Sequence, residues 1–123
     1  MELQIILHSE NRYVEIVTYG VADKHGSRNM AETISLTLKK YRYTKVLIDH
    51  RNIESVSGET MDIYDRPNIF KIIGVILGIR IAEIVKPENI EHFRFLETVC
   101  LNRGYTFSIF HDKQSALEWL LDK

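Results

Sequence analysis

The sequence lacks several features that mark secreted proteins. It holds a single cysteine, Cys100, so an internal disulfide is excluded and a reducing compartment fits best. The N-terminal residues 1–4 do not show the basic and then apolar pattern of a secretory signal. We therefore expect a cytoplasmic location.

Long apolar runs and an excess of one charge are lacking as well. The most apolar region, residues 69–85, is interrupted by charged side chains, and its longest clean run covers only residues 72–79. A helix that crosses a bilayer needs about 20 apolar residues, so we expect no membrane span. Sixteen basic residues stand against 17 acidic ones, for a net charge of -1. Nucleic-acid binding is disfavoured because it depends on a surplus of Lys and Arg.

Motifs for cofactors and metals are missing too. The sequence has no Gly-x-Gly-x-x-Gly or Walker-type loop, and no Cys-x-x-Cys or His-x-x-x-His pair. Cys100 falls on the apolar face of a predicted helix, where a cysteine usually behaves as a small buried hydrophobe rather than a nucleophile. We therefore expect no cofactor, no metal site and no catalytic residue of these types.

The composition that is present is that of one ordinary globular domain. The chain has 123 residues, of which 45% are hydrophobic and 27% are charged. This length supports a single core and is too short for two. We therefore treat residues 1–123 as one domain.

Hydrophobic periodicity predicts strands that alternate with helices. Residues 3–7 and 13–19 are typical of an antiparallel hairpin, with Gly20 ending its second strand. An amphipathic helix is predicted from Ser27 to Tyr41, a short buried strand at residues 46–48, and further strands at 80–85 and 105–110. Helices are expected within 61–78, from Pro87 to Gly104, and after Asp112, which is placed to cap the last one. The order predicts an α/β fold with a single mixed, mostly parallel sheet of about five strands and about four helices.

Three stretches carry a resemblance to a known family. They are Val46-Leu47-Ile48-Asp49 followed by a polar loop, Arg80-Ile81-Ala82 opening a strand, and the tail Phe110-His111-Asp112 through Ala116-Leu117-Glu118-Trp119-Leu120. With these motifs in this order, the chain resembles the STAS-like fold of bacterial anti-sigma-factor antagonists, and more closely the small SpoIIAA-like proteins. The resemblance covers nearly the whole chain. It implies a non-enzymatic regulatory or protein-interaction module.

The same resemblance makes Ser57 a candidate phosphosite. In the antagonists, the loop after this strand presents a serine that a partner kinase phosphorylates. Here Ser57 precedes Gly58, but no aspartate stands before it and the Asp-Ser-Ser-Gly run of the antagonists is missing. The residues alone also suit Ser57 to a helix cap, and the start of a helix favours a phosphate. Both roles remain open.

Polar side chains follow the ends of the predicted parallel strands, which meet at one edge of the sheet. This candidate polar site consists of Tyr19, His50, Arg51, Asn52, His111 and Asp112. Two histidines with a carboxylate could bind a metal or act as acid and base. The histidines belong to separate loops, however, and Asp112 is also a predicted cap. A hydrolase-type enzyme at this edge is our third hypothesis.

The stretch 69–78 is apolar on nearly every face, so the sheet alone cannot cover it. A partner subunit, an apolar ligand, or packing against the preceding turn would do so. The residues of this candidate surface are Ile63, Tyr64, Ile69, Phe70, Ile73 and Leu77. Our first hypothesis is a regulatory module that forms a homodimer through residues 61–78 and binds a protein partner. Our second is a carrier or sensor of a small apolar, lipid-like ligand.

Overall fold

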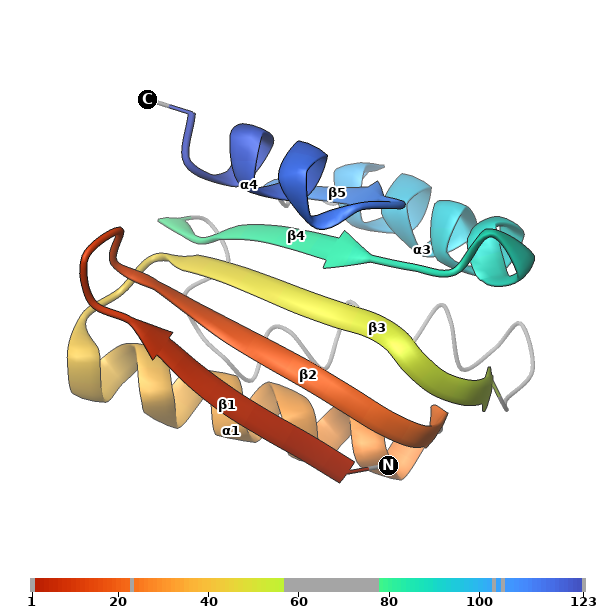
Figure 1. Ribbon diagram of the computed structural model, residues 1–123, viewed down its shortest axis with the longest axis horizontal. Helices are drawn as coiled ribbons and strands as arrows, with labels where there is room; N and C mark the ends of the chain where they lie inside the picture. The colour runs from red at the N-terminus through yellow and green to blue at the C-terminus, as the bar shows by residue number, and fades with distance from the viewer. Residues whose placement is uncertain (1, 23, 57–77, 103, 105, 123) are drawn as a thin grey trace.

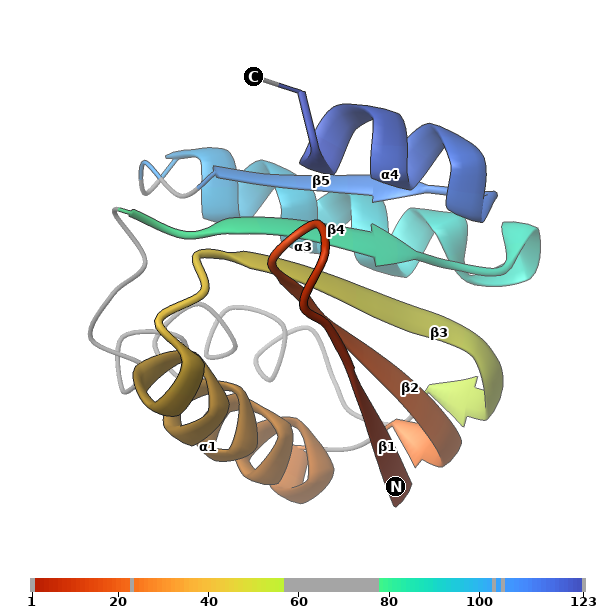
Figure 2. The same ribbon diagram turned by 60° about the vertical axis from the view of Figure 1, so that its left-hand side comes forward.

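The computed structural model describes residues 2–22, 24–56, 78–102, 104 and 106–122. Within them, five strands form one sheet in the order β1-β2-β3-β4-β5, with helices on both of its faces (Figures 1 and 2). The elements are β1 (Glu2–His8), β2 (Tyr13–Ala22), α1 (Lys24–Tyr41), β3 (Lys45–Val56), β4 (Arg80–Ile84), the short 3-10 helix η2 (Pro87–Asn89), α3 (Ile90–Asn102), β5 (Thr106–Phe110) and α4 (Lys113–Leu120).

The sheet confirms the predicted mixed and mostly parallel topology. β1 pairs antiparallel with β2, and β2-β3, β3-β4 and β4-β5 all pair in parallel. The described residues hold three α-helices rather than the four that we predicted. Residues 61–77, which include most of the predicted second helix, lie outside the described part of the chain.

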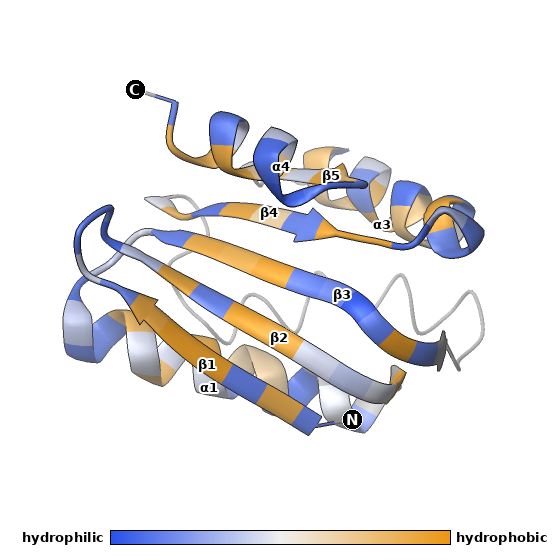
Figure 3. Ribbon diagram, viewed as in Figure 1, coloured by the Kyte–Doolittle hydropathy of each residue, from blue (hydrophilic) through white to orange (hydrophobic). Residues whose placement is uncertain are grey.

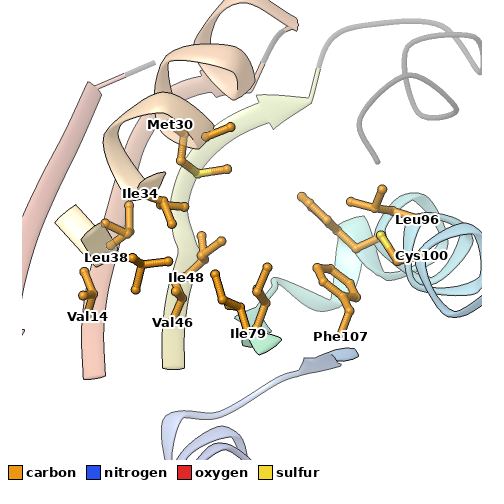
Figure 4. Packing of buried hydrophobic residues seen from close by; sticks show 14 of the residues in the cluster. Val14, Met30, Ile34, Leu38, Val46, Ile48, Ile79, Leu96, Cys100 and Phe107 are labelled. Carbon is orange, nitrogen blue, oxygen red and sulfur yellow. The ribbon is translucent and has the colours of Figure 1, made fainter. Parts of the chain in front are cut away.

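Alternation along the strands divides the core into two layers. One face of the sheet packs against α1 and α3, and we call it the α1/α3 face. The amphipathic stripe of α1 is buried there, with Met30, Ile34 and Leu38 at most 4% exposed (Figure 4). On the opposite face, called the α4 face, Leu47, Ala82 and Ile84 pack against α4 through Ala116 and Leu120. Successive strand residues point to opposite faces, so each face has its own set of functional candidates.

The prediction for the third strand was wrong in its length. We expected a strand that stops at Ile48 and a polar loop from Asp49 onward, but β3 continues to Val56. Among the residues that the structure describes, its second half pairs with β2 alone, and its pairing with β4 ends at Asp49. Ile53 is fully buried in this second half. The polar residues in the second half of β3 belong to a two-stranded ribbon with β2. Such a ribbon tolerates polar side chains because much of its surface faces water.

Gly20 does not end β2, contrary to the prediction. It sits at a φ of 86° beside a register shift between β2 and β3, and the strand continues to Ala22. A bulge of this kind leaves one residue out of step and increases the local twist, and glycine adopts the positive φ at low cost. The glycine therefore bends the ribbon instead of terminating it.

The predicted helix ends at Gly104 and Asp112 agree with the structure. Gly104 has a φ of 82°, and its N–H donates to the Leu101 carbonyl at 3.0 Å just after α3. The Asp112 carboxylate accepts a hydrogen bond from the Ser115 N–H at 2.7 Å, which caps α4. None of the helices in the described ranges combines the length and the apolar composition that a membrane crossing requires.

Candidate functional site

Three polar side chains line up inside the protein across three adjacent strands. Thr18 of β2, His50 of β3 and Glu83 of β4 are 0%, 4% and 1% exposed. The His50 ring lies between the other two. Its Nδ1 is 2.7 Å from Thr18 Oγ1, and its Nε2 is 3.5 Å from Glu83 Oε1. We call this group the Thr18-His50-Glu83 cluster.

Strand alternation explains why the cluster faces inward. In each strand, alternate residues point to the α1/α3 face, and the first of these are apolar. The cluster member is the polar residue that follows them on the same face. The Phe93 ring of α3 stacks on the His50 ring, with centroids 5.1 Å apart. The preceding inward residues are Val14 and Ile16, Val46 and Ile48, and Ile81.

The hydrogen bonds within the cluster fix the orientation of the His50 ring. The Thr18 hydroxyl donates to the Asp49 carbonyl at 3.2 Å and lies 2.7 Å from His50 Nδ1, where the histidine tautomer decides which of the two atoms donates. The distance from Nε2 to Glu83 is longer than a well-formed hydrogen bond. Within the described residues, Glu83 Oε2 has no hydrogen-bond partner. The arrangement therefore holds an imidazole in place between a hydroxyl and a carboxylate, all three enclosed.

A second polar cluster occupies the α4 face and centres on Glu15. Its side chain is only 5% exposed, and Oε1 lies 2.7 Å from His8 Nε2. Lys113 of α4 donates to both carboxylate oxygens, at 3.2 and 3.1 Å. The His8 ring also stacks on Tyr13, with centroids 4.3 Å apart. Glu15 thus connects β1, β2 and α4, and its negative charge is compensated by a lysine.

Asp49 and Arg51 form a bidentate ion pair beside this cluster. The Arg51 Nε and Nη2 donate to the two Asp49 oxygens at 3.0 and 2.9 Å, and the Arg51 backbone N–H donates to Oδ1 at 3.0 Å. Burial by itself raises the pKa of Asp49, but these hydrogen bonds and the Arg51 charge outweigh it and hold the pKa below its usual value. The carboxylate is therefore kept ionised as a structural partner of Arg51.

The predicted polar site at the strand ends is divided by the sheet. His50 is enclosed on the α1/α3 face, whereas Arg51 reaches Asp49 on the α4 face. The hydrogen bond to Asp49 raises the pKa of Arg51 against the effect of burial, and the charges of Glu15 and Asp112 add to it. Arg51 and Asp112 are thus electrostatic neighbours, but His50 is not part of their group.

The remaining predicted residues of that site lie at the surface. The Tyr19 hydroxyl donates to Gln4 Oε1 at 3.1 Å, and the residue is 37% exposed. Asn52 is exposed in the second half of β3, and His111 is exposed just after β5. In Asp112, the hydrogen bonds from Ser115 are the largest cause of a pKa below the usual value, and the His111 charge contributes. Asp112 acts as a helix cap.

Sequence reasoning missed three buried polar residues, Thr18, Glu83 and Glu15, and also Lys113, the partly exposed partner of Glu15. A signal existed for Glu83, because a carboxylate inside the apolar stretch 80–85 must find a buried partner when that stretch is a central strand. No comparable signal pointed from Glu15 to Lys113, which lies 98 positions away. Such pairs become visible only when the strand order is known.

Seven predicted residues lie outside the described part of the chain. They are the candidate phosphosite and the candidate apolar surface: Ser57, Ile63, Tyr64, Ile69, Phe70, Ile73 and Leu77. The described residues contain no group of three or more His, Cys, Asp or Glu side chains placed to hold a metal ion.

Comparison with known proteins shows the fold. The sequence matches no protein-family model and no curated protein. Among solved structures, it is similar to an uncharacterized protein of the DUF3478 family with a SpoIIAA-like fold from Shewanella loihica. That match has 19% identity and a TM-score of 0.60, and it covers 97% of this chain and 92% of the other.

Two anti-sigma-factor antagonists show the same likeness. The antagonist SpoIIAA in its unphosphorylated form matches with 12% identity and a TM-score of 0.56, over 93% of this chain and 92% of its own. An anti-sigma-factor antagonist from Mycobacterium paratuberculosis matches with 12% identity and a TM-score of 0.62, over 98% and 96%. The chain therefore has the SpoIIAA-like fold, as its sequence motifs predicted.

Proposed function

We propose that this protein is a non-enzymatic regulatory module that works as a homodimer and through contacts with a protein partner. The observation that carries the proposal is the burial of the Thr18-His50-Glu83 cluster, whose members are at most 4% exposed. A hydroxyl, an imidazole and a carboxylate in line are groups that a hydrolase uses, but a substrate must reach them. Enclosed side chains of this kind orient and stabilise the strands instead.

The fold supports the same proposal by analogy. Solved proteins with this fold include anti-sigma-factor antagonists, and SpoIIAA has been described in phosphorylated and unphosphorylated forms. A fold alone does not determine a function, so the partner has to be found by experiment. In this proposal, residues 51–58 and the helix predicted within residues 61–78 form the partner face, and Ser57 is its candidate switch.

The enzyme alternative is tested with a panel of ester, phosphoester and peptide substrates. We expect no turnover above that of a heat-treated sample. Turnover that disappears in His50→Ala, while the circular dichroism of that variant stays native, would overturn the non-enzymatic proposal. Glu88→Gln is the matched surface control, because the Glu88 side chain is 69% exposed.

The protein-partner proposal is tested by affinity purification of the tagged chain from its own cells. We expect one protein to co-purify in a fixed stoichiometric ratio. The phosphate switch is tested with Ser57→Asp and Ser57→Ala, because only the first adds a negative charge. Release of the partner by Ser57→Asp alone supports the switch, and equal binding by both variants removes it.

Native mass spectrometry separates the homodimer from the apolar-ligand carrier. The residues proposed to line a ligand pocket, Ile69, Phe70, Ile73 and Leu77, lie outside the described residues. A mass equal to twice that of one chain, with no additional bound mass, favours the homodimer. A single-chain mass with a co-purified lipid-sized molecule favours the carrier instead.

A further inference from the structure

β1 is an open edge of the sheet. It pairs with β2 on one side, and in the described residues no strand pairs with its other side (Figure 1). Proteins normally protect such edges with charged residues, prolines or covering elements, because unpaired N–H and C=O groups invite another strand. Between Glu2 and His8, β1 carries no charge and no proline, and Figure 3 shows its apolar residues in orange.

An apolar groove runs beside this edge, between β1 and α1. Its volume is about 310 Å³, and Ile5, Leu7, Leu36, Thr37, Lys40 and Tyr41 line it. Four of the seven large hydrophobic residues that are exposed in the described chain gather here: Ile5 at 42%, Leu7 at 38%, Leu36 at 70% and Tyr41 at 39%. Exposed apolar side chains that gather at one place are candidates for an interface.

The sequence of β1 is complementary to itself. When two copies of β1 pair antiparallel with Ile5 opposite Ile5, Leu3 lies opposite Leu7 of the second copy, and Glu2 lies opposite His8. Residues of equal parity share a face, so the pairs of leucines and isoleucines lie on the side of α1 in both copies. At both ends of the seam, Glu2 lies opposite His8, whose Nε2 already contacts Glu15 at 2.7 Å, so Glu2 of the second copy would meet the other edge of the ring.

Other registers lose this match. An axis at Gln4 places Glu2 opposite Ile6, and an axis at Ile6 leaves Glu2 with no opposing residue in the strand. A slip by one residue would exchange the two faces of the strand. Charge complementarity at a rim adds little affinity but selects the register and suppresses wrong pairings.

We propose that a second copy of this chain binds at the β1 edge, with Ile5 on the two-fold axis and the outer face of α1 completing the interface. This rests on the proposed homodimer and places its contact at β1, whereas the sequence predicted a contact through residues 61–78, most of which lie outside the described residues. A specific interface buries about 1,200–2,000 Å² in total, more than a seven-residue strand pair supplies by itself. Leu36 and Tyr41 from both copies provide the additional apolar area over the groove.

Disulfide trapping tests the register. Directly opposite residues in an antiparallel pair have Cα atoms about 4.5–5.5 Å apart, which is within the range of a disulfide. In a Cys100→Ala background, Ile5→Cys should cross-link to itself under mild oxidation. Leu3→Cys and Leu7→Cys should each cross-link poorly alone and efficiently when mixed. Leu101→Cys, 53% exposed on α3, is the control that should stay monomeric.

Analytical ultracentrifugation tests the interface without added thiols. Leu36→Glu and Ile5→Lys should each raise the dimer dissociation constant by about tenfold or more, and Leu101→Glu should leave it unchanged. Circular dichroism establishes that each variant is folded. A monomeric wild-type chain overturns the homodimer itself. A dimer that resists both variants and gives no Ile5→Cys cross-link leaves the homodimer standing but overturns its placement at β1.

Discussion

Lys113 Nζ donates to both carboxylate oxygens of Glu15, although the two residues are 98 positions apart in the sequence. The contact joins the last helix to the second strand, and His8 of the first strand completes it from the other side. Glu15 is almost fully buried, so its charge depends on Lys113 for compensation, and His8 contributes a hydrogen bond. The contact therefore connects α4 to the hairpin formed by β1 and β2.

Removing the lysine should therefore destabilise the protein more than removing an ordinary surface charge. We expect Lys113→Met to lower the free energy of unfolding by about 1 kcal/mol, a modest value because the lysine is 42% exposed. Lys39→Met on α1 is the control, with an expected change within about 0.5 kcal/mol. Urea denaturation measures both. Equal effects in the two variants would show that the Glu15 contact contributes nothing.

The Asp49 pair predicts a loss of stability in acid. The folded-state pKa of Asp49 is below its usual value, so the unfolded chain takes up the proton first as the pH falls. The contribution is fully present above about pH 4, the usual aspartate pKa, and disappears as the pH falls through the folded-state pKa. Urea titrations at neutral and acidic pH measure it.

Asp49→Asn is the variant for that measurement. It should be less stable than the wild type near neutral pH and show a smaller further loss in acid, because the titrating group has been removed. Glu88→Gln, on a side chain that is 69% exposed, is the control and should follow the wild-type curve. Parallel pH profiles for wild type and Asp49→Asn would contradict the role given to this carboxylate.

Position 112 should tolerate residues that can cap a helix and should not tolerate residues that cannot. Asp112→Asn retains an oxygen that can accept from the Ser115 N–H, whereas Asp112→Ala leaves that N–H without it. We expect the melting temperature to fall clearly in Asp112→Ala and only slightly in Asp112→Asn. If the two variants melt together, the hydrogen bond to Ser115 does not stabilise α4.

Glu83 should matter for its volume more than for its charge. The contact to His50 is long, and within the described residues one carboxylate oxygen has no hydrogen-bond partner. Glu83→Gln, which keeps the shape, should change the free energy of unfolding by less than about 1 kcal/mol. Glu83→Ala should cost about 2–4 kcal/mol because it leaves a cavity between three strands. A loss in Glu83→Gln as large as that in Glu83→Ala would show that His50 requires the charge.

Local patterns predicted the elements that depend on local physics. The α1 stripe of Met30, Ile34 and Leu38 follows from helical spacing, and the Asp112 cap and the Gly104 stop follow from backbone chemistry. The parallel direction of β2 to β5 followed from the right-handed crossovers that join parallel strands. These predictions needed no knowledge of tertiary contacts.

The missed features depend on which strands become neighbours. β3 was predicted to stop at Ile48 because the residues after it are polar, yet β2 offers a pairing partner as far as Val56. His50 was expected in a loop at the strand ends, but it lies in β3, and its ring contacts Thr18, Glu83 and Phe93. Local composition does not show which strands and helices become neighbours, and those neighbours decided both outcomes.

The uneven support of β3 has a consequence for its motions. Residues 45–49 pair with β2 on one side and β4 on the other, whereas from residue 50 onward the strand pairs, within the described part of the chain, with β2 alone. A two-stranded ribbon is only marginally stable by itself. Amide hydrogens should therefore exchange with deuterium slowly up to Asp49 and much faster beyond it, so that one continuous strand contains an anchored half and a half that opens on its own.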